Sequence, residues 1–460
     1  MLRSALLIFS LALTSLSSGE TPNIVLIFAD DVGYGDLGCY GSSNETPALD
    51  KLANQGVRAL DFNSAANVCS PSRAALLTGR YPMRNGHPYY RTDDKEWNYG
   101  LHPEEITVAE QLKKANYTTY ALGKWHLGFE KAGSHPMDQG FDSYYGLAYN
   151  YSTRHDPYNE AIYRNRKVEE AKVKFPAITP QYNDELKRII GSHPKEQPFF
   201  LYMAHQIAHS PIAPSADFQG VTGKGKYADF LAELDHSCQV ILDALEENGF
   251  SENTLVVFTS DNGHVPGVGS GGPLSGGKYG TMEGGHRVPF IARWPGQLPE
   301  NNTVETTISS MDLFPLFSSI AGVELPTDRV IDGKNILSVL RGKTTASPHE
   351  LLYYYNGTNL QAVSKGKWKL HLPREAEDQP FWGKVILRKK APEGKNAGFY
   401  TLNEPFLVNL ETNLAETKNV ADDHPEVVAE LLAHAEEARS ELGDVGSQGS
   451  DQRPLWPPRP

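Results

Sequence analysis

Polar side chains that can bind metal ions or transfer protons follow directly after four short apolar runs of the sequence. They are Asp30 and Asp31, Lys124 and His126, His205 and His209, and Asp261 and Asn262. The apolar runs are typical of buried parallel strands, and the carboxyl ends of such strands meet at one edge of a sheet, where ligands bind. We therefore expect these side chains, from four distant segments, to converge on one site.

The acidic members of this set predict a metal site. Asp30, Asp31, Asp261 and Asn262 offer only oxygen ligands, which favour calcium or magnesium over zinc or copper. Adjacent aspartates repel each other, and a divalent cation removes that penalty. Taken alone, the first pair fits a helix cap or a solvated turn better, and the matching second pair shifts the balance to a metal. Asp36 lies in the same loop and is expected to act as a cap.

A cysteine stands at the start of a predicted helix. The order Cys69-Ser70-Pro71-Ser72-Arg73, followed by Ala-Ala-Leu-Leu, indicates a helix that begins near the cysteine. Cys69 would then face the positive end of the helix dipole, which is a natural anion site, with Arg73 one turn along on the same face. On composition alone, a small buried cysteine at a helix entry fits equally well.

These motifs together resemble the type I sulfatases, relatives of alkaline phosphatase in which the cysteine is oxidised to formylglycine. The signature is Cys-x-Pro-x-Arg followed by Ala-Ala-Leu-Leu-Thr-Gly-Arg at residues 69–80. Further matching blocks lie at residues 30–36, 123–128, 261–263 and 277–289. The resemblance runs from about residue 22 to the C-terminal helix. It is nearest to the arylsulfatase A and N-acetylgalactosamine-6-sulfatase branch.

The resemblance implies a role for each residue of the site. It implies one calcium ion per chain, held by Asp30, Asp31, Asp261, Asn262 and the modified Cys69. The hydrated aldehyde at position 69 would attack sulfur, and Arg73 would stabilise that nucleophile. Lys124 and Lys278 would neutralise the sulfate oxygens. His209, placed by the Ser-Pro that follows it, would protonate the leaving oxygen, alone or with Lys278, and His126 would remove the proton that allows sulfate release.

The substrate is a further expectation. Arg154 and His155 lie in an aromatic-rich loop where relatives contact substrate, and this pattern fits an ordinary surface loop equally well. His205 is either a substrate contact or a structural histidine. A weaker set of candidates is His87, Tyr89, Tyr90 and Arg91.

We expect a sulfuric ester hydrolase that removes sulfate from a sulfated glycan or oligosaccharide by exo action. Its second partner would be a formylglycine-generating maturation enzyme. Two alternatives remain: a phosphodiesterase or phosphonate hydrolase of the same superfamily, and a non-catalytic glycan-binding homologue.

Bulk properties limit the other functions. The 460 residues carry a formal net charge of -13, so a general field that holds nucleic acid is excluded. Arg3, the apolar run 6–16 and the small residues after it predict a signal peptide at 1–19 and export to the periplasm or the medium (lysosomal or extracellular in a eukaryote). No later segment predicts a membrane span. Three cysteines make no disulfide framework; Cys39 and Cys238 could pair, and two free thiols are favoured.

Apolar and helical patterns alternate through most of the chain. Residues 24–29, 118–122, 199–203 and 255–259 predict parallel strands, and residues 107–115 and 227–247 predict helices. This order predicts an α/β fold with a large mixed, mostly parallel sheet between helix layers, and the resemblance implies its alkaline-phosphatase-like form. We assign residues 20–345 to this catalytic domain.

The pattern of apolar and polar residues changes beyond about residue 345. Residues 351–355, 361–364 and 367–372 predict antiparallel strands, with Lys365-Gly366 as a tight turn. Residues 373–397 are polar and predict a surface excursion, and 424–442 predict an amphipathic helix. We expect 346–445 to form a smaller α+β subdomain, followed by a flexible tail at 446–460.

Overall fold

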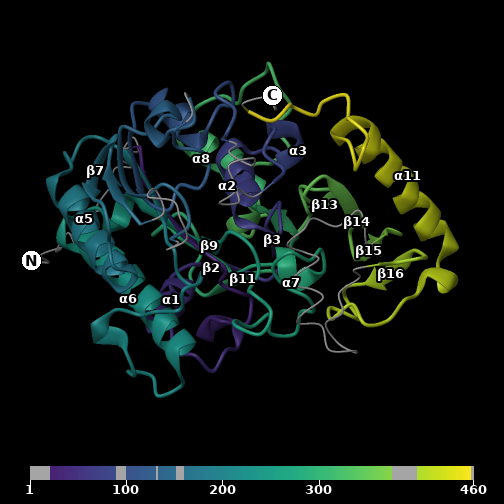
Figure 1. Ribbon diagram of the computed structural model, residues 1–460, viewed down its shortest axis with the longest axis horizontal. Helices are drawn as coiled ribbons and strands as arrows, with labels where there is room; N and C mark the ends of the chain where they lie inside the picture. Colours follow the sequence, from purple (N-terminus) through teal and green to yellow (C-terminus); the bar gives the residue numbers. More distant parts are fainter. Residues whose placement is uncertain (1–20, 90–99, 131–132, 152–159, 376–400, 457–460) are drawn as a thin grey trace, which may run out of the picture.

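Two sheets organise the chain, one large and mixed, the other small and antiparallel (Figure 1). The computed structural model describes residues 21–89, 100–130, 133–151, 160–375 and 401–456. The predicted signal peptide, Arg154 and His155, Tyr90 and Arg91, and most of the predicted excursion at 373–397 therefore lie outside the described residues.

The large sheet has ten strands in the order β11-β2-β10-β9-β1-β8-β4-β5-β6-β7. Its centre is parallel: β1 (Asn23–Ala29) lies between β9 (Thr254–Ser260) and β8 (Phe199–Ala204), and β4 (Thr118–Gly123) and β5 (Ser143–Leu147) follow. These include all four predicted strands. The remaining strands are β2 (Val57–Ala59), β10 (Phe290–Arg293), β11 (Asn302–Val304), β6 (Ile162–Arg164) and β7 (Lys167–Glu170). Antiparallel pairing of β10 with β9 and β2, and of β6 with β5 and β7, makes the sheet mixed.

Helices cover both faces of this sheet, as predicted (Figure 1). Alternate residues of β1 point to opposite faces, so Ile24, Leu26 and Phe28 belong to one core, and Val25 and Ile27 to the other. The first core includes residues of α2 (Cys69–Thr78), α4 (Val108–Lys113) and α8 (Leu313–Ile320). The second includes residues of α1 (Pro47–Asn54), α5 (Ile178–Ser192) and α6 (Lys226–Glu247). Shorter elements are α3 (Pro82–Asn85), α7 (Glu283–His286), α9 (Leu337–Leu340), and the paired β3 (Phe62–Asn63) and β12 (Ile308–Ser309).

The C-terminal sheet is antiparallel throughout. Its strands, in order, are β13 (Leu352–Asn356), β14 (Asn359–Lys365), β15 (Trp368–His371) and β16 (Phe406–Asn409). Gly366 supplies the left-handed turn between β14 and β15, with φ of 54°. The helix α11 (Pro425–Leu442) packs on the sheet through Leu431, Ala435 and Leu442.

The predicted flexible tail differs from what the structure shows for residues 446–456. This segment contacts the part of the chain that forms the large sheet and its helices: Arg453 Nε lies 2.8 Å from Glu105 Oε1, and Trp456 pairs with Gly100. The buried Glu105 gives the arginine an ionic partner, so this part of the tail has defined contacts despite its proline-rich composition.

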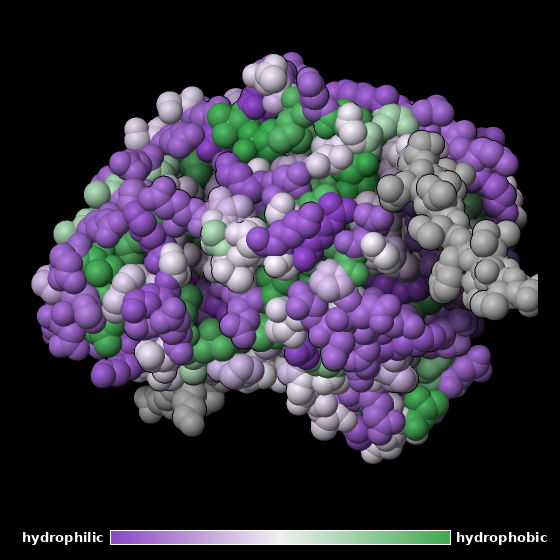
Figure 2. All heavy atoms as spheres, turned by 180° about the vertical axis from the view of Figure 1, so that it is seen from behind, coloured by the Kyte–Doolittle hydropathy of each residue, from purple (hydrophilic) through white to green (hydrophobic). Residues whose placement is uncertain are grey.

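Figure 2 shows one face that is mostly hydrophilic, with hydrophobic groups between the polar ones. The exposed large hydrophobic residues among those described are Val168, Val221, Leu325, Val330 and Val445. No described helix combines the length and the apolar character needed to cross a membrane. Cys39 and Cys238 are free, as the sequence favoured.

Candidate active site

Four oxygen-bearing residues meet where β1 and β9 end. These strands are parallel neighbours with Ala29 opposite Ser260, so Asp30 and Asp31 lie beside Asp261 and Asn262. Carboxylate oxygens of the three aspartates lie within 4.8 Å of one another. Calcium binds oxygen at about 2.4 Å, so oxygens at this separation can share one ion. The predicted convergence of the two acidic pairs is therefore present.

The donor set fits a divalent cation. Asn262 Nδ2 donates a hydrogen bond to Asp31 Oδ1 at 2.7 Å and one to the carbonyl oxygen of Gly263 at 2.9 Å. Two buried oxygens, Asp31 Oδ2 and Asn262 Oδ1, have no hydrogen-bond partner among the described residues. Buried polar atoms without a partner are costly, and a hard cation would satisfy both oxygens. The residues present therefore suit calcium or magnesium.

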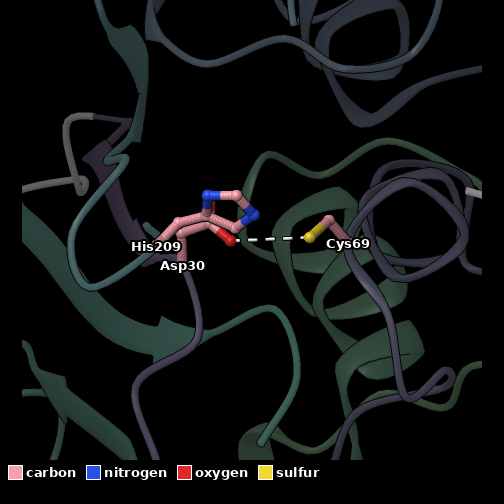
Figure 3. A group of neighbouring side chains, drawn as sticks. All are labelled: Asp30, Cys69 and His209. Carbon is pink, nitrogen blue, oxygen red and sulfur yellow. Dashed lines mark hydrogen bonds between the residues drawn. The ribbon is translucent and has the colours of Figure 1, made fainter. Parts of the chain in front are cut away.

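Cys69 is the first residue of α2 and faces the acidic group. Its Sγ lies 3.5 Å from Asp30 Oδ1 and 3.2 Å from Lys278 Nζ. Figure 3 shows the thiol directed at the Asp30 carboxylate, with the His209 ring beside that carboxylate. Burial raises the pKa of the Cys69 thiol to about 12, although Lys124 and Lys278 act in the opposite direction. The unmodified thiol is therefore protonated and a poor nucleophile.

Arg73 lies one turn further along α2, on the same face as Cys69. Its NH2 group lies 2.8 Å from Asp261 Oδ2 and 3.6 Å from Asp30 Oδ2. Burial disfavours the charge, but Asp261 and Asp30 outweigh it, and the pKa of Arg73 is raised. The guanidinium is thus a fixed positive charge next to residue 69.

Two lysines complete the basic side of the site. Lys124, which follows β4, pairs with Asp30, and Lys278 Nζ lies 2.6 Å from Asp31 Oδ1. Burial would lower the pKa of Lys278, but Asp31 and Cys69 raise it well above its ordinary value. Three carboxylates therefore face three cationic side chains. A divalent cation would leave a net charge near +2, which suits an anionic ester.

The pKa values of Asp30 and Asp261 are shifted in opposite directions. Burial favours the neutral form of Asp30, but Lys124, His209, Arg73 and Lys278 together hold its pKa well below the ordinary value. Burial and the nearby Asp30 raise the pKa of Asp261 to about 6, against the pull of Arg73 and Lys124. A cation between the two carboxylates would remove this conflict.

The three histidines separate into two groups. His209 is partly exposed, and its side-chain ligand atom lies within 4.8 Å of those of Asp30 and Cys69. Burial lowers its pKa, with Asp30 acting in the opposite direction. His126 follows Lys124 with φ of 61° and packs edge-on to Tyr149. The role of His126 in proton transfer stays a prediction.

His205 does not have the surroundings of a substrate contact. Its side chain is fully buried, and Nε2 lies 3.0 Å from Ser237 Oγ in α6. Burial lowers its pKa to about 3, so the ring is neutral. His205 comes directly after β8 and points towards α6, which fits the structural alternative that the sequence left open; a role in substrate binding stays a prediction.

Other residues singled out in the sequence are also placed. Asp36 accepts hydrogen bonds from the amides of Gly33 at 2.7 Å and Ser270 at 2.9 Å, and from Tyr227 Oη at 2.7 Å, so it ties loops together as a cap would. His87 is buried, and Tyr89 Oη lies 3.3 Å from Thr358 Oγ1.

The sequence reasoning missed a buried charge cluster behind Lys278. Its members include Glu283, Lys369 and Glu416. Lys369 and Glu416 belong to no motif and are distant in sequence, so only the hydrophobic neighbours of Lys369 in β15 could have indicated its burial.

Comparisons with known proteins place the chain in a family. A family model described as "Sulfatase" matches residues 22–323, and one described as "C-terminal region of aryl-sulfatase" matches residues 347–459. N-acetylgalactosamine-6-sulfatase from Mus musculus is 40% identical over 403 residues, which cover 80% of this chain and 75% of that protein.

Solved structures agree with this placement. One, from work on the metabolism of multiple glycosaminoglycans by Bacteroides thetaiotaomicron, is 29% identical with a TM-score of 0.80, and the match covers 92% of this chain and all of the other. Another, Ps i-CgsB in complex with k-i-k-neocarrahexaose, is 28% identical with a TM-score of 0.76, covering 91% and 92%. The chain belongs to the sulfatase family, and it is a sulfuric ester hydrolase.

Proposed function

We propose that this sulfatase removes sulfate from a sulfated glycan by exo action, with formylglycine at position 69 and one calcium ion. The observation that carries the proposal is the place of Cys69. Its Sγ lies between Asp30 Oδ1 at 3.5 Å and Lys278 Nζ at 3.2 Å, beside the carboxylates suited to a cation. A residue placed there can act on an anionic group that the cation and the lysines hold.

The residues would divide the work as follows. A bound calcium ion would lower the pKa of a hydroxyl group that it holds and neutralise charge on the sulfate oxygens. Oxidation of Cys69 and hydration of the aldehyde would supply two hydroxyls, one to attack sulfur and one to allow release of sulfate. Arg73, fixed by Asp261, would stabilise the attacking oxygen, while Lys124 and Lys278 neutralise the transferring sulfate.

Proton transfer would fall to the two histidines. His209 is partly exposed, with its ligand atom within 4.8 Å of those of Asp30 and Cys69, and would protonate the sugar oxygen as it leaves. His126 would take the proton from the remaining hydroxyl of residue 69, after which sulfate departs and the aldehyde returns.

The choice of a glycan is supported by the relatives. Two of the similar proteins are an N-acetylgalactosamine-6-sulfatase and a protein solved with a neocarrahexaose. N-acetylgalactosamine 6-sulfate is accordingly the first sugar to test. Export through the N-terminal segment 1–19, to the periplasm or the medium, remains part of the proposal, because sulfated polysaccharides are extracellular materials.

The test is chemical. The chain is expressed with a formylglycine-generating enzyme, and the peptide 59–73 is examined by mass spectrometry. We expect a species in which one sulfur and two hydrogens are replaced by one oxygen. Turnover of sulfated mono- and disaccharides is then compared with that of matched phosphate and phosphonate esters. Preference for the phosphorus esters would favour the phosphonate hydrolase alternative, and binding of sulfated sugar without turnover would favour a glycan-binding homologue.

A further inference from the structure

A cluster of buried charges joins the C-terminal sheet to the segment that carries Lys278. Lys369 Nζ, from β15, lies 2.7 Å from Glu283 Oε1 at the start of α7 and 3.2 Å from Glu416 Oε1. All three side chains have an exposed fraction of 0%. Charges removed from water in this way need partners in fixed positions, so the cluster tolerates few alternative arrangements.

The same cluster clamps α7 on both sides. Glu416 Oε2 accepts a hydrogen bond from the backbone amide of Glu283 at 2.6 Å. Glu283 Oε2 accepts one from Arg287 Nε at 2.6 Å, and Arg287 NH2 lies 3.1 Å from Asp61 Oδ1. His371 Nε2 lies 2.7 Å from Glu416 Oε1, so a second side chain of β15 supports that carboxylate. The end of the Lys278 segment is thereby tied to β15 and to the catalytic domain.

Other contacts tie the segment on both sides of the lysine. Ser275 Oγ donates to the carbonyl oxygen of Ala415 at 2.6 Å, ahead of Lys278. Asn356 Nδ2, from β13, donates to the carbonyl oxygen of Tyr279 at 3.1 Å, directly after it. The C-terminal sheet and the chain beside it therefore hold the segment before and after Lys278.

The segment around Lys278 depends on these contacts because its own backbone can adopt many conformations. Residues 275–287 contain five glycines, at positions 276, 277, 280, 284 and 285. Glycine has the largest conformational freedom of any residue, so a glycine-rich stretch is positioned by its contacts. The short α7, of four residues, adds little order of its own.

We propose that Lys369 is a positioning residue for the sulfatase reaction, acting through Glu283 and Glu416 to hold the Lys278 segment in place. The ammonium group of Lys278 then lies 3.2 Å from Cys69 Sγ, where the transferring sulfate needs it. This inference rests on the proposed function, because it assumes that Lys278 acts on sulfate. It assigns part of the catalytic geometry to the C-terminal sheet.

The test uses Lys369→Met in the full-length, matured protein, with kcat normalised to formylglycine content. A displacement of Lys278 by about 1 Å should lower kcat by about 10- to 100-fold, with a smaller change in KM. Leu431→Ala is the matched control, because Leu431 is buried between α11 and the same sheet but belongs to the apolar cluster there. It should lower the melting temperature and leave kcat near the wild-type value.

A double variant separates positioning from general damage. In a Lys278→Met background, Lys369→Met should cause no further loss of kcat, because the group that it positions is gone. Glu416→Gln covers the case in which Lys369→Met does not fold, since Lys369 keeps Glu283 as its partner. It should lower kcat by about threefold or more, and again only when Lys278 is present.

The outcomes are distinct from those that test the proposed function. If the matured wild-type protein hydrolyses no sulfate ester, the proposed function fails. If it is active, but Lys369→Met and Glu416→Gln retain wild-type kcat, or lose as much in the Lys278→Met background, the positioning inference is overturned and the proposed function stands.

Discussion

Replacement of Lys278 by methionine isolates one charge of the site while keeping most of the side-chain volume. The ammonium group lies 3.2 Å from the sulfur of residue 69, and a sulfate oxygen would lie at a similar distance. Two unit charges at that separation interact by about 5 kcal/mol at an effective dielectric constant of about 20. Because the ester is already anionic before reaction, only part of this energy favours the transition state. We expect a loss of about 3 kcal/mol, or about 10²-fold, in kcat.

The Lys278→Met substitution should not weaken calcium binding, although it lowers turnover. Lys278 Nζ lies 2.6 Å from Asp31 Oδ1, so it repels a cation at that carboxylate. Lys278→Met should therefore bind calcium at least as tightly as the wild-type protein does.

Turnover of a sulfated sugar and titration calorimetry with calcium measure the two effects, with Lys51→Met, at an exposed position of α1, as the control. Activity within about threefold of wild type, or loss of calcium binding in step with activity, would refute the reasoning.

Three further predictions concern the proposed acid, the cation and the buried histidines. His209→Gln should lower turnover of sulfated sugars by about 10²-fold or more and affect nitrophenyl sulfate far less, because nitrophenolate leaves without a proton; equal losses on both substrates would argue against an acid role. Chelation of divalent cations should lower the melting temperature and abolish turnover, and calcium should restore both more fully than magnesium; a melting curve unchanged by chelator would speak against a cation at the three carboxylates. Burial lowers the pKa of His87, His286 and His371 to about 4 each, so these rings are neutral when folded and bind protons on unfolding. Their contribution to stability is present above the unfolded pKa of about 6.5 and is lost as pH falls towards 4, by up to about 1.4 kcal/mol per pH unit for each ring; melting temperatures that stay constant over this range would contradict it.

The part of the site that the sequence predicted comes from the geometry of parallel strands. Asp30 and Asp261 follow adjacent strands in register, so their convergence needs only the assumption that both strands lie in one sheet. The start of α2 at Cys69 was also predictable from local sequence, because serine, proline and a run of helix formers follow it. Local signals and sheet order were enough for these residues.

What the sequence could not predict depends on the side-chain direction or on distant partners. His205 also follows a strand, but its ring points into the helix layer towards Ser237, and strand position alone does not reveal the face. The strands β2, β10 and β11, at one side of the large sheet, have three or four residues each, too few for a periodic pattern. The pairing of Lys369 with Glu283 and Glu416 joins segments that are remote in sequence, and no local sequence pattern predicts it.

Every residue of α2, from Cys69 to Thr78, is buried. If a maturation enzyme oxidises Cys69, as proposed, it must reach the thiol, and in the folded protein this side chain is buried. The oxidation would therefore have to come before this helix is enclosed, on a chain that is still open. Protein that folds before oxidation would keep Cys69 as a thiol. Maturation enzyme added to this folded protein would not restore activity. The active fraction of a preparation would then depend on the rate of oxidation relative to the rate of folding.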